Sequence, residues 1–401
     1  MPGYEWIGKE EKQQIQDVMD TGVFFRYEFP NERKGIYKVM EFEENFARYM
    51  DAAHAHAVTS GSTALKVALA VLGVKPGDEV ITQGFTFVAT FDAIIEAGAV
   101  PIPGEIDYTL NLDPADFEKK ITEKTTAVIP VHMLGAPARI REILEIAQKH
   151  GLKVIEDTAQ ALGASVGGKK VGTWGDMGTF SFDYYKTLTT GEGGMVVTND
   201  RDLYVKASEY ADHGHDHNPA VGRALEGRTY LGFNYRMNEL QGAIGLAQLA
   251  RLDKLFERQK QNQNLIRTTL ERFDKIRMRA LPEGGTDSYT HVAFFLENRD
   301  EAMAFHKRLT EKGVPAVYFK SNFWHYLPNW EHLIQRRTMW PGPFPFGGPV
   351  YGREAKYTPD MLPVSDRILE RLIVMPVFLN TDEERIRTIA KELESAAEQL
   401  L

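Results

Sequence analysis

Between residues 60 and 200, short apolar runs alternate with longer segments in which apolar side chains recur every three or four residues. The first pattern is typical of buried strands and the second of amphipathic helices. In the helical segment that opens at Ser60, for example, Leu65, Leu69 and Leu72 fall on one face. The pattern predicts strands over residues 79–82, 99–102, 127–131 and 153–157, and helices over residues 91–97, 138–149 and from 114 onward.

Short strands that alternate with helices of about ten residues predict βαβ units and a mostly parallel sheet, which is an α/β fold. Such sheets bind ligands beyond the carboxyl ends of their strands. The Gly61 turn and Asp157 both fall at such ends. We therefore expect a small-molecule site to include these two positions.

The pattern changes after residue 175. Two neighbouring strands joined by a turn-rich loop are predicted over residues 178–182 and 194–198, and one long helix from about 238 into the 250s. Beyond it we expect a smaller C-terminal α+β domain, so that the chain divides into residues 1–255 and 256–401. Its expected elements are a strand over 291–295, helices over 299–312 and from 381 to the end, and an irregular loop or lid over 337–364.

Composition narrows the class of protein. The chain of 401 residues has 47 Lys and Arg against 56 Asp and Glu, a net charge of −9, which argues against a nucleic-acid binder with a generally basic surface. It has no cysteine, which excludes a disulfide scaffold, a thiolate metal site and a cysteine nucleophile. No apolar run approaches the length of a membrane span, and the first residues are charged rather than apolar, so we expect a cytoplasmic protein.

Candidate chemistry begins with the small, hydroxylated residues 60–63 in front of a helix. Backbone N–H groups at such a helix start can bind a phosphate, although an ordinary helix cap has the same sequence. Phe87 could stack on a flat ring or fill the core. Asp157 ends an apolar strand, where a buried acid needs a partner such as a protonated ring nitrogen.

Lys186 follows the predicted strand 178–182 in a loop of small residues. A partly desolvated lysine can form a Schiff base, although most single lysines are solvated surface charges. Together, a phosphate cradle, a stacking aromatic ring, a carboxylate and an imine-forming lysine are the parts of a pyridoxal 5′-phosphate (PLP) site.

At this point the sequence resembles the DegT family of PLP-dependent sugar aminotransferases. The resemblance runs over nearly the whole chain and rests on six stretches in one order: residues 59–65, 86–90, 156–160, 178–186, 191–194 and 231–239. It implies the PLP-dependent transferase fold type I, with a large mostly parallel-sheet α/β domain and a small C-terminal α+β domain.

The resemblance also implies roles for single residues. Lys186 would form the imine and Asp157 would pair with the pyridine nitrogen, which makes these two the catalytic residues. The other cofactor contacts are Phe87 on the ring, Gln160 near the phenolic oxygen, and a phosphate site of Gly61, Ser62, Thr63 and Ser181. Where the family commonly has Thr-Ala, this chain has Ser62-Thr63, so either residue could supply the hydroxyl. Asn234 would reach the phosphate in the partner subunit, so a homodimer with shared active sites is expected.

Other stretches resemble the branch of this family that aminates C8 of the sugar acid Kdo, with L-glutamate as amino donor. They are residues 1–3, 22–27, 33–35, 212–217 and 324–326. The expected acceptor is the C8 aldehyde of oxidised Kdo and the expected product 8-amino-3,8-dideoxy-manno-octulosonate. The alternatives are an aminotransferase for a nucleotide-linked keto-sugar, which shares every PLP motif, and a non-catalytic PLP-fold regulator, which an intact Lys186 and Asp157 argue against.

Candidate substrate contacts follow from these stretches. Arg26, with Arg33 and Lys34, would clamp the sugar carboxylate, because the arginine fork suits a carboxylate, or these could be solvated loop charges. His213, His215 and His217, with Asp216, invite a zinc interpretation, but their spacing rarely presents three ligands on one face, and we favour a substrate-contacting or subunit-contacting loop over a structural turn or a metal. Trp324, His325 and Tyr326 would form a wall of the site or pack the small domain.

Overall fold

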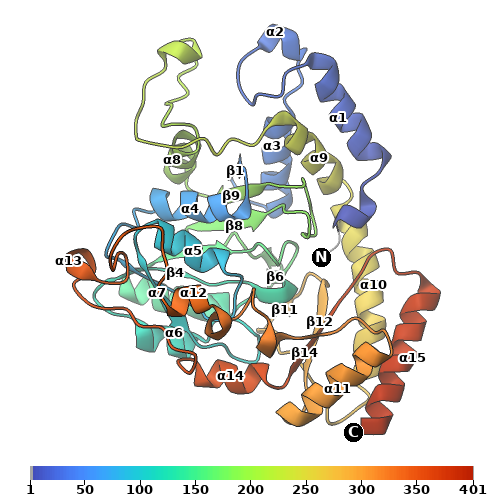
Figure 1. The fold of residues 1–401 in the computed structure, drawn as a ribbon. Helices are drawn as coiled ribbons and strands as arrows, with labels where there is room; N and C mark the ends of the chain where they lie inside the picture. Colours follow the sequence, from blue (N-terminus) through green and yellow to red (C-terminus); the bar gives the residue numbers. More distant parts are fainter. Residues whose placement is uncertain (1–2, 401) are drawn as a thin grey trace.

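The computed structural model describes residues 3–400, and its centre is a seven-stranded sheet (Figure 1). The strand order is β1-β9-β8-β5-β4-β2-β3. Neighbouring strands from β8 to β3 run parallel, whereas β9 is antiparallel to both of its neighbours. The strands are β1 (His54–Val58), β2 (Glu79–Gln83), β3 (Val100–Gly104), β4 (Thr125–Ile129), β5 (Lys153–Asp157), β8 (Met177–Ser181) and β9 (Gly194–Thr198).

Helices cover both faces of this sheet because its buried strands carry apolar side chains on both sides. On β2, for example, Val80 packs with the helices of one face and Ile81 with those of the other. One face is covered by α4 (Gly61–Val71), α5 (Ala89–Glu96) and α8 (Arg201–Tyr210). The other is covered by α3 (Lys38–Met50), α6 (Pro114–Lys120) and α7 (Ile140–His150). The predicted α/β fold and its parallel strands are confirmed.

The predicted long helix is in fact two helices, α9 (Glu239–Leu249) and α10 (Leu252–Leu270). Arg251 breaks the helical backbone with φ −115° and ψ 3°. Its guanidinium group binds Glu10 and Glu11 in α1 (Lys9–Thr21), a helix that packs on α9. The prediction of one helix was wrong because this contact joins residues about 240 positions apart, which helical periodicity does not report.

The second half of α10 packs on a smaller four-stranded antiparallel sheet of order β10-β12-β14-β13. Its strands are β10 (Arg277–Met278), β12 (His291–Phe295), β13 (Val317–Tyr318) and β14 (Leu372–Pro376), and its helices α11 (Arg299–Glu311) and α15 (Glu383–Leu400). Figure 1 shows α15 alongside α10 at the right of the molecule. The predicted strand at 291–295 and the helices over 299–312 and at the C-terminus are confirmed.

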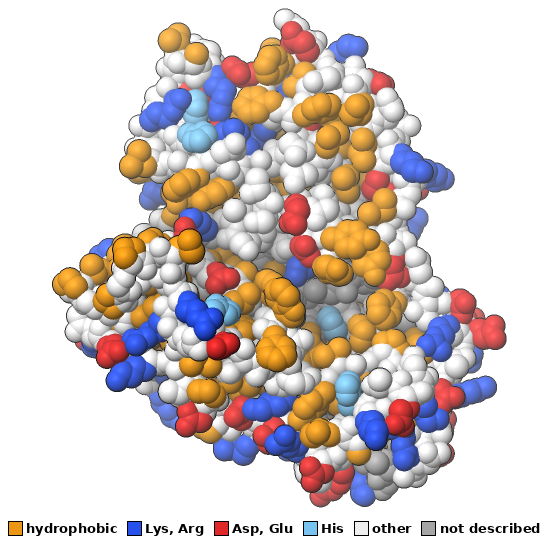
Figure 2. Space-filling view, viewed as in Figure 1, with side chains coloured by type: hydrophobic (Ala, Val, Ile, Leu, Met, Phe, Trp, Pro, Cys, Tyr) orange, Lys and Arg blue, Asp and Glu red, His pale blue; other side chains and the backbone are white. Residues whose placement is uncertain are grey.

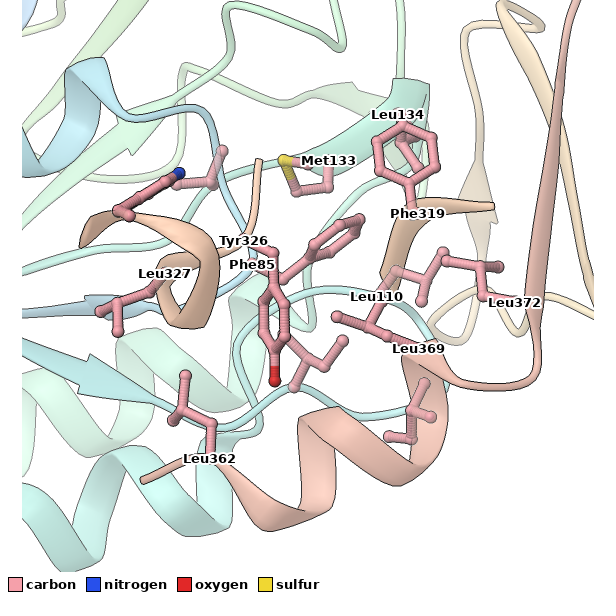
Figure 3. Close-up of a cluster of buried hydrophobic side chains, with 14 of the residues drawn as sticks. Phe85, Leu110, Met133, Leu134, Phe319, Tyr326, Leu327, Leu362, Leu369 and Leu372 are labelled. Carbon is pink, nitrogen blue, oxygen red and sulfur yellow. The ribbon is translucent and has the colours of Figure 1, made fainter. Parts of the chain in front are cut away.

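The segment between β13 and β14 returns to the large sheet. It holds two short 3₁₀ helices at 319–321 and 327–329 and the helices α12 (Glu331–Ile334), α13 (Gly348–Tyr351) and α14 (Pro363–Leu369). Its buried side chains pack with those of the large domain, and Figure 3 shows Tyr326, Leu327 and Leu362 around Phe85. The boundary proposed at residue 255 falls inside α10, and the two-domain division stays a prediction.

The fold also includes α2 (Pro30–Arg33) and a small sheet in which β6 (Ser165–Val166) pairs with β7 (Lys169–Lys170) and β11 (Gly285–Thr286). No helix within residues 3–400 is long and apolar enough to cross a membrane.

Candidate active site

A cavity of about 660 Å³ opens at the carboxyl ends of the parallel strands. We call it the Lys186 pocket. It lies where an α/β sheet is expected to place its ligand. Nine of the residues singled out from the sequence line it: Gly61, Ser62, Phe87, Asp157, Gln160, Ser181, Lys186, Trp324 and His325.

The phosphate cradle forms at the start of α4. Ser60 caps this helix by accepting a hydrogen bond from the Thr63 N–H at 3.1 Å. The Thr63 hydroxyl accepts from the Ser60 N–H at 2.9 Å and donates to the Ser60 carbonyl at 2.8 Å. The hydrogen bonds of the helix cap therefore occupy the Thr63 hydroxyl, whereas Ser62 is exposed to the pocket. Between the two hydroxyl residues left open by the sequence, the geometry favours Ser62.

Gly61 has to be a glycine because β8 ends against it. A Cβ at position 61 would lie 2.6 Å from the Cβ of Ser181, closer than real Cβ atoms approach. The missing side chain lets the start of α4 and the Ser181 hydroxyl lie side by side at the pocket wall. Helix-start N–H groups beside two serine hydroxyls are the donors that a phosphate needs. This cradle fits the phosphate of PLP.

Asp157 is the last residue of β5 and is only 4% exposed. Its carboxylate accepts hydrogen bonds from the Thr90 hydroxyl at 2.9 Å and the Ala159 N–H at 3.1 Å. Burial raises the pKa of Asp157, and these donors and the charge of Lys186 offset part of the rise. A buried, oriented carboxylate in this position can hold a proton on a ring nitrogen. Sequence reasoning did not single out Thr90, although it belongs to the 86–90 motif.

Lys186 lies in the loop after β8, and burial lowers the pKa of its amine. The charges of Asp183 and Asp157 act in the opposite direction. A lowered pKa increases the fraction of neutral amine, which is the form that attacks a carbonyl group. The geometry therefore fits the role expected for this lysine.

The N-terminal segment holds the lysine loop from outside. The Gly3 N–H donates to the Lys186 carbonyl at 3.0 Å, and Tyr4 stacks on Tyr184 with ring centroids 4.7 Å apart. A Cβ on Gly3 would lie 2.5 Å from the Thr187 carbonyl oxygen. These contacts were missed because about 180 residues separate the two segments. Glu192, Tyr185 and His291 also line the pocket and were not singled out.

Aromatic residues form part of the pocket wall. Phe87 is 37% exposed and stacks parallel to Trp324, at 6.1 Å between ring centroids. His325 packs on Phe87, and its Nδ1 lies 3.0 Å from the Asn322 side-chain oxygen. Burial and the charge of Lys186 lower the pKa of His325 to about 4, so this imidazole is neutral near pH 7. Gln160 accepts from the Leu134 N–H at 3.1 Å, which fixes its amide at the pocket edge.

Tyr326 does not belong to this wall, which corrects the sequence prediction. It pairs with Phe85 through the backbone and is fully buried in the hydrophobic core (Figure 3). Its hydroxyl donates to Asp366. The turn at residues 323–325 reaches the pocket, and the next residue enters the core. The correction thus depends on how residues 322–327 pair with residues 84–88.

The residues proposed to clamp the sugar carboxylate also lie outside the Lys186 pocket. Arg26 is buried and bonded to both carboxylate oxygens of Glu43 at 2.6 Å. Arg33 is fully buried, donates to backbone carbonyls of residues 25–36, and pairs with Glu239 at 3.2 Å. Lys34 is exposed at the end of α2. The three-residue clamp is wrong, because Arg33 closes its own loop and Lys34 faces solvent.

The three histidines of the 213–217 stretch also lie outside the Lys186 pocket. His213 is exposed, His215 pairs with Glu226, and the ring of His217 packs at a tilt on that of Tyr27, with centroids 5.0 Å apart. Within residues 3–400 no group of three or more acidic or histidine side chains is arranged to hold a metal ion. Asn234 is exposed on the same loop and lies outside the Lys186 pocket of its own chain.

Comparisons with known proteins agree with this geometry. The sequence profile of the DegT/DnrJ/EryC1/StrS aminotransferase family matches residues 5–342. The GDP-perosamine synthase of Vibrio cholerae is 34% identical over 350 residues, which cover 84% of this chain and 89% of that protein. The pleiotropic regulatory protein of Geobacillus stearothermophilus is 32% identical over 97% of this chain and 95% of its own length.

A crystal structure of 3-amino-5-hydroxybenzoic acid synthase superposes with a TM-score of 0.80 at 28% sequence identity, over 98% of this chain and 97% of that one. The fold is therefore the PLP-dependent transferase fold type I, as expected. Enzymes with this profile are PLP-dependent transaminases that aminate sugars and related substrates. The profile match and the Lys186 pocket together place this chain in the DegT/DnrJ/EryC1/StrS aminotransferase family.

Proposed function

We propose that this aminotransferase moves the amino group of L-glutamate to the C8 aldehyde of oxidised Kdo. The products are 2-oxoglutarate and 8-amino-3,8-dideoxy-manno-octulosonate. The observation that carries the reaction class is the placement of Lys186 and Asp157 in one pocket beside the Gly61–Ser62 cradle. The sugar-acid substrate rests on the resemblance of the N-terminal, 212–217 and 324–326 stretches to the Kdo branch of the family.

The residues of the pocket divide the chemical work. When bound, PLP supplies an electron sink for the pair left as a Cα–H bond breaks. Asp157 would hold a proton on the ring nitrogen of the bound cofactor. Lys186 would hold the cofactor through its amine and, when that amine is free, would move a proton within the pocket. Phe87 and Trp324 exclude water from one side of the site.

The character of the pocket lining supports a neutral, hydroxylated end of the sugar at the reacting centre. Among its described lining residues, Lys186 supplies the one lysine or arginine charge, and His325 is neutral near pH 7. A neutral imidazole can donate to or accept from sugar hydroxyls. The carboxylate of the sugar acid would then be held away from the reacting carbon.

The second candidate is an aminotransferase for a nucleotide-linked keto-sugar, as the name of the Vibrio cholerae relative suggests. Reverse turnover with 2-oxoglutarate separates the two, with 8-amino-Kdo compared against nucleotide-linked 4-amino-sugars. We expect a higher kcat/KM for 8-amino-Kdo. Faster turnover of any nucleotide sugar would replace the substrate and leave the PLP chemistry intact.

A regulator without catalysis is the third candidate, as the name of the Geobacillus stearothermophilus relative suggests. The retained Lys186 and Asp157 argue against it, and measurable turnover of any amino-sugar excludes it. A cytoplasmic location stays a prediction.

A homodimer with shared active sites is also part of the proposal. Apolar side chains gather on the upper part of the face in Figure 2, around α1 and α9. Exposed apolar side chains include Met19 in α1, Phe24 after it, and Leu231 and Phe233 on the loop before α9, where Leu231 is 96% exposed and Phe233 packs on Tyr210 of α8. A second copy of the chain would bury such a surface. Asn234 lies beside these residues, where it would reach the phosphate of the partner's cofactor.

Mixed dimers test this sharing. A chain with Lys186→Ala and a chain with Asn234→Ala should together form one site with both residues intact. Verified heterodimers should recover about half of the wild-type activity per dimer, while each variant homodimer stays impaired. Heterodimers no more active than the Asn234→Ala homodimer would show that Asn234 acts within its own chain.

A further inference from the structure

A second cavity, of about 850 Å³, lies apart from the Lys186 pocket and shares no lining residue with it. It is enclosed by the N-terminal segment 26–40, by α8 and by the loop 216–226. Figure 2 shows histidine and basic side chains gathered over this loop at the upper left. We call it the Arg26–Arg223 cavity. Its volume is in the range of small-molecule sites.

Two buried guanidinium groups in this cavity each have an unpartnered nitrogen. The side chain of Arg26 is 8% exposed, and its Nη2 binds Glu43 while Nη1 makes no hydrogen bond. The side chain of Arg223 is 13% exposed, and its Nη2 binds Asp212 at 2.7 Å. Its Nη1 is also unpartnered, at 3.6 Å from Glu226. Leaving a buried donor unpaired lowers the stability of the folded chain.

Both guanidinium groups lie over the ring of Tyr27, with Arg26 Cζ at 5.3 Å and Arg223 Cζ at 4.9 Å from its centroid. Each already has one carboxylate partner, Glu43 for Arg26 and Asp212 for Arg223. The geometry thus brings two unused donors of the same charge to one cavity.

Four of the five carboxylates that line the cavity are bonded to protein donors, and the fifth, that of Glu28, is exposed. Glu43 accepts from Arg26 and from the Ala57 N–H, and Glu226 pairs with His215. Asp216 accepts from the Asn218 N–H at 3.1 Å, and Glu209 from the Thr229 hydroxyl at 3.2 Å. Among the described lining residues, the unpartnered buried polar atoms are the two guanidinium nitrogens. A ligand that satisfies the cavity must therefore be an acceptor.

We propose that the Arg26–Arg223 cavity binds the carboxylate of a polyhydroxylated acid. The identity of that acid as Kdo rests on the proposed function. The arginine nitrogens would receive the carboxylate oxygens, since guanidinium and carboxylate groups match in charge and plane. Tyr37, Tyr204 and Ser208 line the remaining wall and can contact sugar hydroxyls.

The loop that forms the cavity also carries Asn234. Asp212, which holds Arg223, forms a backbone bridge with Asn234, and its carboxylate also binds Arg236 at 2.6 Å. If Asn234 contacts the partner's cofactor, the Arg26–Arg223 cavity also lies near the partner's Lys186 pocket. One chain would then hold the acid end of the sugar while the other chain's lysine faces C8. The same rigid unit explains why the cavity is separate from Lys186 in its own chain.

The test measures binding of Kdo itself to the PLP-loaded enzyme by calorimetry at fixed ionic strength. The probes are Kdo, its carboxamide and inorganic phosphate. Arg223→Lys keeps a cation beside Asp212 and removes the free fork nitrogen. Arg228→Lys is the matched control, because Arg228 lies on the same loop, is exposed, and donates only to backbone carbonyls of Glu226 and Gly227.

We expect Arg223→Lys to weaken Kdo binding at least about tenfold, as loss of one charge-assisted hydrogen bond does. Arg228→Lys should leave it within about twofold, and the carboxamide should bind at least about tenfold more weakly than Kdo. Unchanged Kdo affinity in Arg223→Lys, or carboxamide affinity equal to that of Kdo, would overturn the proposal. Phosphate binding as tight as Kdo would also overturn it, in favour of a general anion site.

At Arg26 a single substitution would leave Glu43 as a lone buried charge and could prevent folding, so the test uses a double variant. Arg26→Gln combined with Glu43→Gln removes the buried pair without leaving a lone charge, and its folding is checked by thermal unfolding. It too should weaken Kdo binding at least about tenfold. A folded double variant with wild-type affinity would refute a role for Arg26.

These experiments distinguish failure of the cavity proposal from failure of the proposed function. Turnover of 8-amino-Kdo with an unchanged KM in Arg223→Lys would reject the cavity and keep the reaction. Kdo binding that depends on Arg223 in an enzyme that does not turn over 8-amino-Kdo would reject the reaction and keep the site. A heterodimer of Lys186→Ala and Arg223→Lys chains should have one site with wild-type KM if the cavity acts on the partner's pocket.

Discussion

The Lys186 pocket and the Arg26–Arg223 cavity are built in different ways. Strand ends and helix starts place the residues of the first, and each of its motifs is a short local stretch. The second is enclosed by two loops and two helices, and its central contacts join residues that loops carry together. A parallel sheet fixes where strand ends meet, whereas loop residues depend on which distant segment they pack against.

The two regions also differ in their unpaired groups. Asp157 has two protein donors, and Lys186 sits among carboxylates that favour its charge. The cavity retains two donors without acceptors. The Lys186 pocket offers groups that suit the different parts of a cofactor, whereas the Arg26–Arg223 cavity offers donors that suit one oxyanion. Substitutions in either region should therefore change different measurements.

Lys186→Ala should produce the largest effect. Turnover should fall by at least about a thousandfold, because Lys186 supplies the one lysine amine among the described residues that line the pocket. Borohydride should fix cofactor to the wild type and not to the variant. Kdo binding in the Arg26–Arg223 cavity should stay unchanged, which separates the two regions. Lys206→Ala, on the exposed face of α8, is the control, and wild-type turnover by Lys186→Ala would remove the assignment.

Asp157→Asn should lower turnover by about a hundredfold to a thousandfold, the usual effect of losing one oriented electrostatic group. The side-chain oxygen can still accept from Thr90, so the pocket should keep its shape. The visible absorption of the bound cofactor and its pH titration should shift with the loss of charge. A variant with normal turnover and an unshifted titration would show that another group holds the ring proton.

The same variant has a pH-dependent effect on stability without cofactor. Burial raises the folded-state pKa of Asp157, so its contribution to stability is fully present below the unfolded value of about 4 and is lost as pH rises through the folded value. The asparagine amide of the variant does not titrate. As pH rises across this window, the free energy of unfolding of the wild type should therefore fall relative to that of the variant. A pH-independent difference in urea unfolding would contradict the raised pKa.

Much of the Lys186 pocket could be predicted because its signals are local. The strand that ends at Asp157 and the helix that starts after Ser60 each follow from a few adjacent residues. The break at Arg251 could not, because it depends on Glu10 and Glu11 in another helix. The contact of Gly3 with the lysine loop has the same cause. Pairings across such separations leave no periodicity in the sequence.

Arg26 and Tyr326 show the same limit at the level of function. Both lie in stretches that resemble a substrate-specific branch, and their residue types suit a sugar acid. Arg26 proved to be paired with Glu43 in a different cavity, and Tyr326 to be part of the core. A stretch that resembles its relatives contains packing residues as well as contacts. Only the backbone pairing tells them apart.

Gly61→Ala should weaken cofactor binding by about tenfold. The new Cβ would lie 2.6 Å from the Cβ of Ser181, and relieving such overpacking typically costs about 1–3 kcal/mol. The loss should be in PLP affinity, measured by titrating the cofactor-free protein, with little change in Kdo binding at the other cavity. Gly191→Ala is a matched control for space, since nothing lies within 4 Å of its Cβ position, although its positive φ adds some strain. Equal PLP affinity in Gly61→Ala and the wild type would show that the start of α4 does not approach the phosphate.

The smallest effect concerns the adjacent residues of the 324–326 stretch. Tyr326→Phe removes a hydroxyl that donates to Asp366, while Asp366 keeps its ion pair with Lys320. The free energy of unfolding should fall by about 1 kcal/mol, the usual value of one buried hydrogen bond, and KM should not change for either substrate. Trp324→Ala should do the reverse, because Trp324 is 64% exposed and stacks on Phe87 in the pocket. Its stability should stay within about 0.5 kcal/mol of the wild type while KM for the sugar rises. A KM effect in Tyr326→Phe with no loss of stability would return Tyr326 to the site wall. It would also mean that residues 322–327 and 84–88 pair differently in the working enzyme.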